Sequence, residues 1–86
     1  MNTLIQEFSD YLRIEKRNSP NTISAYRRDL LRFSAELAGQ KVESVTTADI
    51  RDFLISIKKK GLSAASVARS LSSIKSFFKY LYHDKQ

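Results

Sequence analysis

The chain has no cysteine, one histidine, one proline and two glycines among its 86 residues. The absence of cysteine excludes disulfides and thiolate metal sites. The only histidine, His83, lies among the last four residues, and no group of carboxylates stands at metal-ligand spacing from it. Two isolated glycines cannot supply the row of amide donors of a phosphate-binding loop. We therefore expect no catalytic residue, metal, cofactor or small-molecule ligand in this chain.

Long apolar runs are also missing. No segment approaches the roughly 18 consecutive apolar residues that indicate a membrane-spanning helix. The first residues lack the basic start and apolar centre of a signal peptide. From these two absences we expect a cytoplasmic protein with no membrane partner.

Acidic side chains are absent between Asp52 and Asp84, whereas this stretch contains six lysines and arginines. Over the whole chain 15 Lys and Arg residues oppose 9 Asp and Glu residues, which gives a formal net charge of +6. Such a balance favours a polyanionic partner such as nucleic acid. The length and a hydrophobic content of 42% predict one small domain, residues 1–86, around a single core.

Start and stop signals predict four helices, over residues 3–16, 20–38, 46–60 and 63–82. Pro20 suits the first position of a helix, and Thr46 with Asp49 has the spacing of a capping box. Short connections between amphipathic helices predict an all-α, compact four-helix bundle. The expected N-caps are Ser19, Thr46 and Ser63, and the expected terminators are Gly39 and Gly61.

Apolar residues recur at helical spacing and define the expected core. The buried stripe of the second helix consists of Ile23, Tyr26, Leu30, Phe33 and Leu37. The buried stripe of the fourth helix consists of Val67, Leu71, Ile74, Phe78 and Leu81. Its outer face then consists of Ser66, Arg69, Ser72, Ser73, Ser76 and Tyr80. On this pattern Phe78 is a buried anchor, and Arg69, with no acid to balance it, can be removed without loss of stability.

The fourth helix carries serine where a solvated helix normally carries Glu or Lys. Serine is a mediocre helix former because its hydroxyl competes for backbone hydrogen bonds, so this face is interpreted as shaped for close contact. Hydroxyl groups donate well to phosphate oxygens. The candidate DNA contacts on this helix are therefore Ser66, Arg69, Ser73 and Ser76.

The second helix presents a compatible outer face. Arg28 and Arg32 are one turn apart and could reach phosphates or a guanine edge. The small Ser24 and Ala25 beside them would let the helix approach DNA closely. The alternative is that both arginines are ordinary solvated side chains, partly balanced by the two acids of the same helix.

Other interpretations stay open. Lys58, Lys59 and Lys60 could contact phosphates, or they could simply suit the negative end of a helix dipole. The whole domain could be a helical protein–protein interaction module with a solubilising basic surface, in which Leu31 or Phe77 touches a partner chain. RNA binding is compatible with the charge, although exposed aromatic platforms are few.

Two separated blocks of the sequence resemble a known family. The first block is the run SPNTISAYRRDL over residues 19–30, followed by Phe33. The second block comprises Gly61-Leu62-Ser63, Ser66, Arg69, Leu71-Ser72, Ile74-Lys75, Phe77-Phe78 and Tyr80-Leu81. Both are similar to the core-binding domain of tyrosine recombinases, also called phage integrases, and particularly to its Xer-like branch.

The resemblance implies an orthogonally packed, SAM-like four-helix domain that forms one jaw of a clamp around double-stranded DNA during site-specific recombination or integration. In this family the second and fourth helices cross the major groove, and the full assembly contains other recombinase protomers as partners. The DNA contacts implied by position are Thr22, Ser24, Ala25, Arg28, Lys60, Ala65, Ser66 and Arg69. Ala25 and Ala65 are small, so direct reading of base sequence should be limited.

Catalysis in this family depends on an arginine, lysine, histidine and nucleophilic tyrosine set on a C-terminal domain. None of Tyr11, Tyr26, Tyr80 and Tyr82 has the surrounding histidine and arginine motif. The resemblance therefore implies that this chain is not itself an enzyme. We expect a DNA-binding fragment of a larger recombinase whose catalytic domain lies outside this sequence.

Overall fold

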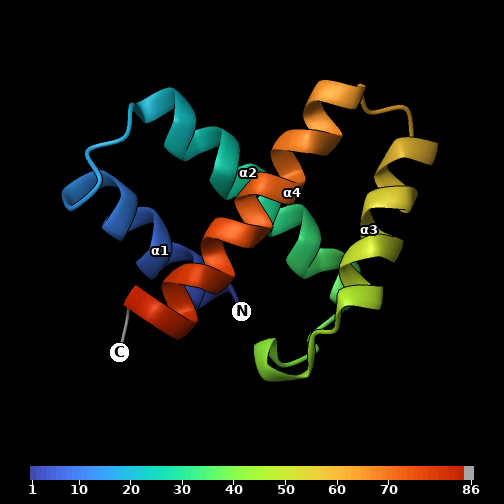
Figure 1. Ribbon diagram of the computed structural model, residues 1–86, viewed down its shortest axis with the longest axis horizontal. Coiled ribbons are helices and arrows are strands. Elements are labelled where there is room, and N and C mark those ends of the chain that lie inside the picture. Colours follow the sequence, from blue (N-terminus) through green and yellow to red (C-terminus); the bar gives the residue numbers. More distant parts are fainter. Residues whose placement is uncertain (85–86) are drawn as a thin grey trace.

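The computed structural model describes residues 1–84, which form helices and turns with no strand among them (Figure 1). The four α-helices are α1 (Asn2–Ile14), α2 (Pro20–Leu37), α3 (Thr47–Lys59) and α4 (Ala64–Lys79). A short 3-10 turn, η1 (Val42–Ser44), precedes α3, and a π-helical turn, η2 (Tyr80–Asp84), extends α4. The all-α, four-helix prediction is confirmed, with helix ends that differ from the predicted ones by a few residues.

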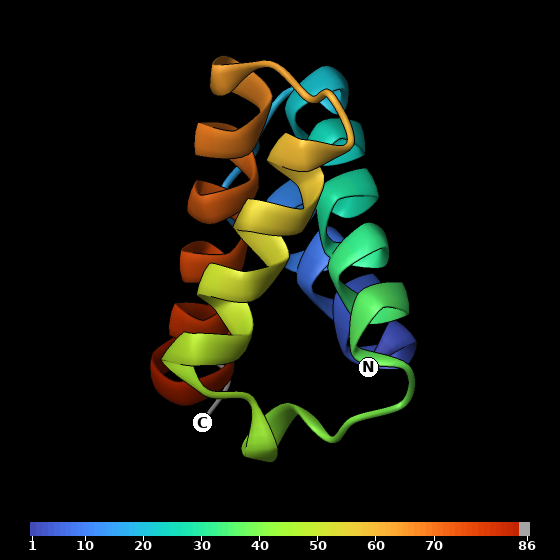
Figure 2. The same ribbon diagram turned by 90° about the vertical axis from the view of Figure 1, so that its right-hand side faces the viewer.

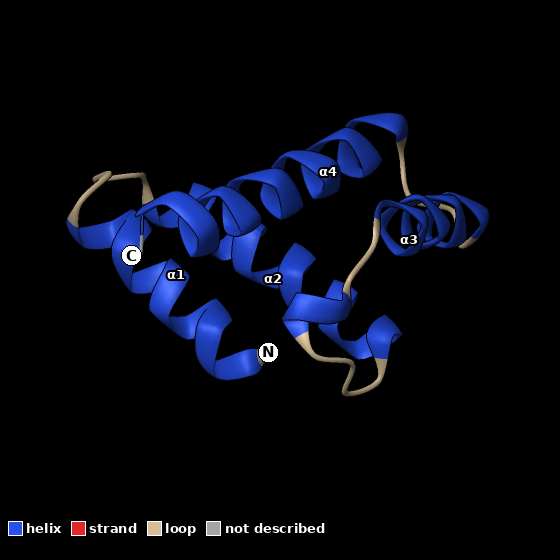
Figure 3. Ribbon diagram, turned by 60° about the horizontal axis from the view of Figure 1, so that its bottom comes forward, coloured by secondary structure: helices blue, strands red, loops and turns tan. Residues whose placement is uncertain are grey.

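α2 and α4 cross at the centre of the molecule, and α1 and α3 lie on either side of this crossing (Figure 1). Figure 2 shows α3 in front of the α2–α4 pair, and Figure 3 shows α4 lying across α2. The molecule measures 17 Å along its shortest axis, which allows only two layers of helices at the usual spacing of about 8–10 Å. α2 and α4 therefore each keep one long face towards solvent.

The predicted starts of α2 and α4 are confirmed. Ser19 Oγ accepts a hydrogen bond from the backbone N–H of Thr22 at 3.2 Å, and Pro20 occupies the first turn. Ser63 Oγ accepts in the same way from the N–H of Ser66 at 3.1 Å. Each serine satisfies an amide that the first turn of a helix leaves without a backbone partner.

The start of α3 is a complete capping box. The Thr46 hydroxyl accepts from the Asp49 N–H at 3.1 Å, and the Thr46 N–H donates to Asp49 Oδ2 at 2.9 Å. Gln40 Nε2 donates to the same carboxylate oxygen at 3.1 Å. The hydrogen bond from the Thr46 backbone, and then that from Gln40, lower the pKa of Asp49 below its ordinary value of 3.8. Gly61 follows α3 with φ of +100°, as its predicted role as terminator requires.

Each of the four helices contributes one fully buried phenylalanine to a common core. The rings of Phe8 and Phe77 meet edge to face with centroids 5.6 Å apart, and those of Phe33 and Phe53 do so at 5.1 Å. These geometries are favoured by the ring quadrupoles. The buried apolar residues are Ile5, Phe8, Leu12, Leu30, Phe33, Val42, Phe53, Ile57, Ile74, Phe77 and Tyr80.

The predicted orientation of the fourth helix is wrong. Phe77 is fully buried, whereas Phe78 is half-buried and stacks on Tyr82 with ring centroids 6.1 Å apart. Ser73 and Tyr80, both predicted on the outer face, are 0% and 8% exposed. The helix is therefore rotated about its axis relative to the stripe that hydrophobic spacing alone suggests.

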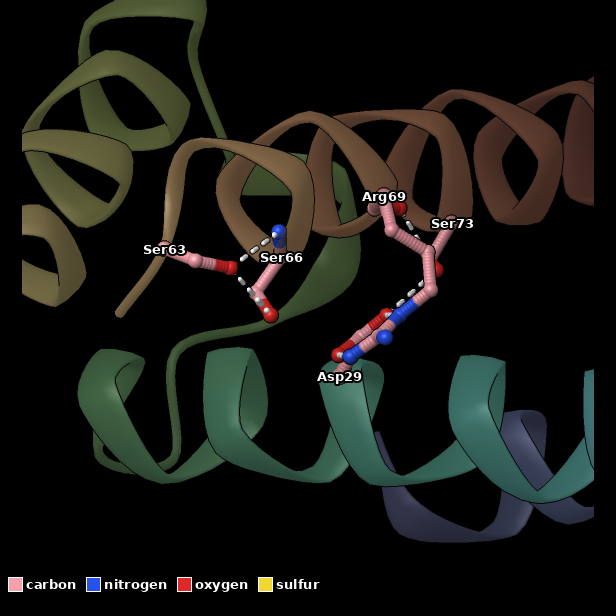
Figure 4. Close-up of polar contacts among 5 residues, drawn as sticks. All are labelled: Asp29, Ser63, Ser66, Arg69 and Ser73. Carbon is pink, nitrogen blue, oxygen red and sulfur yellow. Dashed lines mark hydrogen bonds and ion pairs between the residues drawn. The ribbon is translucent and has the colours of Figure 1, made fainter.

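A buried charged cluster between α2 and α4 explains this rotation (Figure 4). The carboxylate of Asp29 is 0% exposed. Arg69 donates to it through Nε at 2.9 Å and Nη2 at 3.0 Å, and the Ser73 hydroxyl lies 3.0 Å from Oδ2. A buried carboxylate is tolerated only when its charge is matched and its oxygens accept hydrogen bonds. α4 must consequently turn Arg69 and Ser73 towards α2.

The expectation that Arg69 has no acid to balance it is therefore wrong. Removing Arg69 would leave the Asp29 carboxylate buried without a counterion. Breaking a fully buried pair in this way costs about 3–5 kcal/mol. The cost here should lie near or below the lower end, because the Arg69 side chain is 36% exposed.

Ser70 lies beside this cluster and is also 0% exposed. Within the described residues its hydroxyl has no hydrogen-bond partner. The two neighbouring buried serines therefore differ: Ser73 satisfies a buried charge, and Ser70 carries a polar atom that the fold does not use.

The orientation of α4 can be tested with two neighbouring alanine variants. We expect Phe77→Ala to lower the free energy of unfolding by about 3–5 kcal/mol, because it deletes a fully buried ring. Phe78→Ala should cost only about 1–2 kcal/mol, because that ring is partly buried at the edge of the core. Urea unfolding followed by circular dichroism measures both values, and a larger loss for Phe78→Ala would contradict this orientation.

The two buried serines should respond in opposite ways to the same change. Ser73→Ala is expected to cost about 1–3 kcal/mol, because it removes a hydrogen bond to a buried carboxylate. Ser70→Ala should leave stability unchanged or raise it by up to about 1 kcal/mol, because an unpaired hydroxyl is lost and alanine favours the helix. Equal losses of stability for Ser73→Ala and Ser70→Ala in chemical denaturation would contradict the different roles of the two serines.

The capping box predicts an acid-dependent stability. The pKa of Asp49 is lower in the folded protein than the ordinary value of 3.8. The stability that Asp49 contributes is therefore fully present above pH 3.8 and is lost as the pH falls through the lower pKa of the folded state. Asp49→Ala should therefore be less stable than the wild type at neutral pH, with a difference that shrinks in strong acid. Thermal midpoints of both proteins from about pH 7 to about pH 2 test this, and a pH-independent difference would refute it.

Candidate nucleic-acid interface

The predicted contacts on α2 share one flank of that helix. At about 100° of rotation per residue, Ala25, Arg28 and Arg32 lie on the same side of Asp29, away from the core. Ser24 and Arg28 are exposed, and Ala25 and Arg32 are half-buried. The structure thus brings four of the predicted residues together on one accessible surface.

On α4 the corresponding flank consists of small side chains and lysine. Ala65, Ala68 and Ser72 are exposed, and so is Lys75. By the same helical rotation they lie on the side of Arg69 that faces away from the core. Because Arg69 of α4 binds Asp29 of α2, both flanks adjoin the crossing of the two helices. We call this surface the α2–α4 flank; it consists of Ser24, Ala25, Arg28, Arg32, Ala65, Ala68, Arg69, Ser72 and Lys75.

Thr22 and Ser66 are each tied to the start of a helix. The Thr22 hydroxyl accepts from Ser19 Oγ at 3.0 Å, and the Ser66 hydroxyl accepts from Ser63 Oγ at 3.1 Å (Figure 4). Both residues are half-buried. Each hydroxyl keeps its own proton to donate, so capping does not prevent a contact with an external acceptor.

The two other predicted serines on α4 do not belong to the flank. Ser73 is buried against Asp29, so its predicted outward orientation is wrong, and it cannot reach a ligand outside the fold. Ser76 is half-buried and lines a cavity of about 260 Å³ between α1, α2 and the end of α4, together with Tyr26 and Lys79. This volume is below the roughly 300–1,000 Å³ of typical ligand pockets.

Both acids of α2 are paired with cations from other elements. Asp29 is held by Arg69 on α4, and Glu36 lies 3.7 Å from the Lys60 ammonium. Within residues 1–84, Arg28 and Arg32 make no ion pair. The alternative in which Asp29 and Glu36 partly balance the two arginines is therefore wrong, because both acids pair with other cations.

Lys60 lies immediately before the turn into α4, where its ion pair with Glu36 places it beside the end of α2. Its side chain is 64% exposed, and such surface pairs contribute little and are easily exchanged for another partner. Lys58 and Lys59 are also exposed at the end of α3. Phosphate contact by these lysines stays a prediction.

Arg69 combines a buried attachment with an accessible edge. Its hydrogen bonds to Asp29 raise the pKa of the Arg69 guanidinium further, so this side chain remains charged at any physiological pH. About a third of the side chain is nevertheless exposed. The flank therefore has a fixed positive group at the point where α2 and α4 cross.

Sequence reasoning missed the role of Asp29 and the outward position of Ala68 and Lys75. A usable signal was present, because Asp29 stands between Tyr26 and Phe33 in the apolar stripe of α2. An acid in such a place requires a cation on the facing helix. This requirement predicts a cation opposite Asp29, but it does not choose between Arg69, Lys75 and Lys79 of α4.

The two side chains suggested as contacts for a partner protein are packed into this fold. Phe77 is 0% exposed, and Leu31 is partly buried against the core. The large exposed apolar residues are Ile14, Ile55 and Tyr82, which are distributed over α1, α3 and η2. Scattered exposed apolar residues are usual on protein surfaces, so no candidate docking surface comes from Leu31 or Phe77.

The described residues contain neither a metal-ligand cluster nor a membrane-spanning helix. Over residues 1–84, no three His, Cys, Asp or Glu side chains gather as a metal ion would require. In the same range no helix combines the length and the apolar character needed to cross a bilayer.

Comparison with known proteins identifies relatives along nearly the whole chain. Residues 5–85 match the family described as phage integrase, N-terminal SAM-like domain. The chain is 44% identical over 84 residues to tyrosine recombinase XerD of Proteus mirabilis, covering 95% of this chain and 27% of that protein. It is 42% identical over 84 residues to tyrosine recombinase XerC of Listeria monocytogenes, covering 94% of this chain and 28% of that protein.

A third relative, tyrosine recombinase XerD of Staphylococcus haemolyticus, is 39% identical over 88 residues, which cover 99% of this chain and 30% of that protein. The chain thus spans less than a third of the length of these curated relatives. No solved structure matches it significantly. Because the family match runs from within α1 to beyond α4 and includes the crossing of α2 and α4, the chain belongs to the family of phage integrase N-terminal SAM-like domains.

Proposed function

We propose that this domain binds double-stranded DNA through the α2–α4 flank and holds it for a site-specific recombination or integration reaction. The proposal rests on Arg28 and Arg32 of α2, which make no ion pair within the described residues. They lie beside α4, a helix that contains no acid. Unpaired cations on one face are the electrostatic footprint of a nucleic-acid-binding surface.

The distribution of charge supports contact with the DNA backbone. Asp29, the acid of α2 next to Arg28, is enclosed and paired with Arg69, so it presents no free carboxylate to a phosphate at the flank. Phosphate contacts supply most of the affinity and the orientation of such complexes. We therefore assign Arg28, Arg32 and Arg69 to phosphate contact.

The small residues of the flank support a close approach. Ala65, Ala68 and Ser72 on α4 and Ser24 on α2 are exposed and short, so the two helix backbones can come near a groove or a phosphate row. The major groove of B-DNA is about 12 Å wide and admits one α-helix. With so few long polar side chains beyond the arginines, recognition should depend more on backbone contacts than on base readout.

The chemistry of strand exchange is assigned to another part of the parent protein. The relatives that are named tyrosine recombinases are more than three times as long as the matched region. This supports a binding module that works with a separate catalytic domain and, in the assembled complex, with other recombinase protomers.

DNA binding by the flank should be strongly dependent on salt. If four to six phosphates are neutralised, log affinity should fall with log salt concentration with a slope of about −4 to −5. Arg28→Ala should reduce the magnitude of that slope by about 1. The matched control Arg13→Ala, which removes an arginine of α1 paired with Asp10, should leave the slope unchanged.

Fluorescence anisotropy with a labelled mixed-sequence duplex, at several salt concentrations, measures all three slopes. No binding by the wild type at low salt would refute DNA binding. Equal effects of Arg28→Ala and Arg13→Ala would place the bound DNA elsewhere on the surface.

A further inference from the structure

We propose that Asp29 is a positioning residue that holds Arg69 with one edge of its guanidinium towards solvent, as a preorganised contact for a phosphate of duplex DNA. The inference rests on DNA binding by the α2–α4 flank. It goes further by giving the buried acid of α2 a role in that binding.

The hydrogen bonds of Arg69 use only part of its guanidinium. Nε and Nη2 donate to the two oxygens of Asp29 in a fork at 2.9 and 3.0 Å. Neither of these two hydrogen bonds uses Nη1. The Arg69 side chain is 36% exposed and the Asp29 side chain 0%, so the carboxylate is enclosed while part of the arginine side chain stays accessible.

The orientation of Arg69 is itself fixed by a further contact. The Ser73 hydroxyl lies 3.0 Å from Asp29 Oδ2 and 3.0 Å from the backbone carbonyl of Arg69 (Figure 4). The single hydroxyl proton of Ser73 can be donated to either acceptor, which keeps this serine beside the carboxylate and beside the backbone of the helix that carries the arginine. Arginine loses much side-chain freedom when it binds an anion, and here that ordering is complete before DNA arrives.

The surroundings of the accessible edge suit a phosphate. Arg28 precedes Asp29 by one residue and Arg32 follows it by three, so both flank the crossing on the solvent side. Ser72, one turn from Arg69 on α4, is exposed and can donate a hydrogen bond. A phosphate at the crossing would meet cations and a hydroxyl from both helices.

A purely structural role for the pair predicts the opposite effect of mutation. If Arg69 only neutralises Asp29, then replacing Asp29 with asparagine adds a net positive charge to the flank and should strengthen binding to a polyanion. If Asp29 positions Arg69, the same change releases the guanidinium and weakens binding in spite of the added charge. The sign of the effect therefore separates the two roles.

The test compares Asp29→Asn with Glu43→Gln, which removes one negative charge from an exposed residue of η1. Both variants are titrated against the same labelled duplex at a temperature where circular dichroism shows them folded. We expect Asp29→Asn to bind about fivefold to tenfold more weakly, with a salt slope smaller by about 1, since one phosphate contact is lost. Glu43→Gln should bind as tightly as the wild type or more tightly.

A second variant covers the case in which Asp29→Asn does not fold. Arg69→Lys keeps the positive charge and a partner for Asp29. A single ammonium, however, lacks the planar set of donors with which a guanidinium can bind a carboxylate on one edge and a phosphate on the other. We expect the salt slope of Arg69→Lys to be smaller by about 1. A folded Asp29→Asn that matches or exceeds wild-type affinity, or an Arg69→Lys with wild-type affinity and slope, would overturn the proposal. Absence of binding by the wild type would instead refute the proposed function itself.

Discussion

The position of α4 depends on one buried carboxylate. Asp29 is enclosed at the crossing of α2 and α4, where an ionised oxygen without hydrogen bonds would be too costly to keep. Arg69 and Ser73 supply those bonds, and both must point towards α2 to do so. Once this face of α4 is directed inwards, Phe77 enters the core and Phe78 moves to its edge.

The same constraint shapes the surface proposed to hold DNA. Asp29 is neutralised by Arg69 inside the fold and is not available to the neighbouring Arg28 and Arg32. Within the described residues these two arginines therefore form no ion pair. The rotation of α4 also moves Ala68 and Lys75 outwards. A cluster that secures the packing of two helices thus also determines which side chains those helices offer to a ligand. Family membership is independent of this argument, because it rests on the match over residues 5–85.

Local signals predicted the helices well because their causes are local. Ser19, Thr46 and Ser63 cap their own helices through residues three positions ahead, so neither the core nor a neighbouring helix is needed to place them. In α3 the apolar residues Phe53 and Ile57 stand four positions apart, and both are buried. Periodicity works there because the helix presents one clear apolar stripe and carries its charges on the opposite side.

For α4 the apolar stripe was ambiguous, and hydrophobic spacing could not decide its orientation. Phe77 and Phe78 are adjacent, and either can belong to an apolar face with helical spacing. Serine is small enough to lie on the buried side or on the exposed side of the helix. The sequence by itself determined the number of helices, their starts, the basic character of the chain and its resemblance to a family. Only the tertiary structure decided which side of α4 is buried, because that depends on Asp29, forty residues away from Arg69 in the chain. A buried charge must be paired wherever its partner lies, and this requirement outweighs the small difference between two apolar stripes.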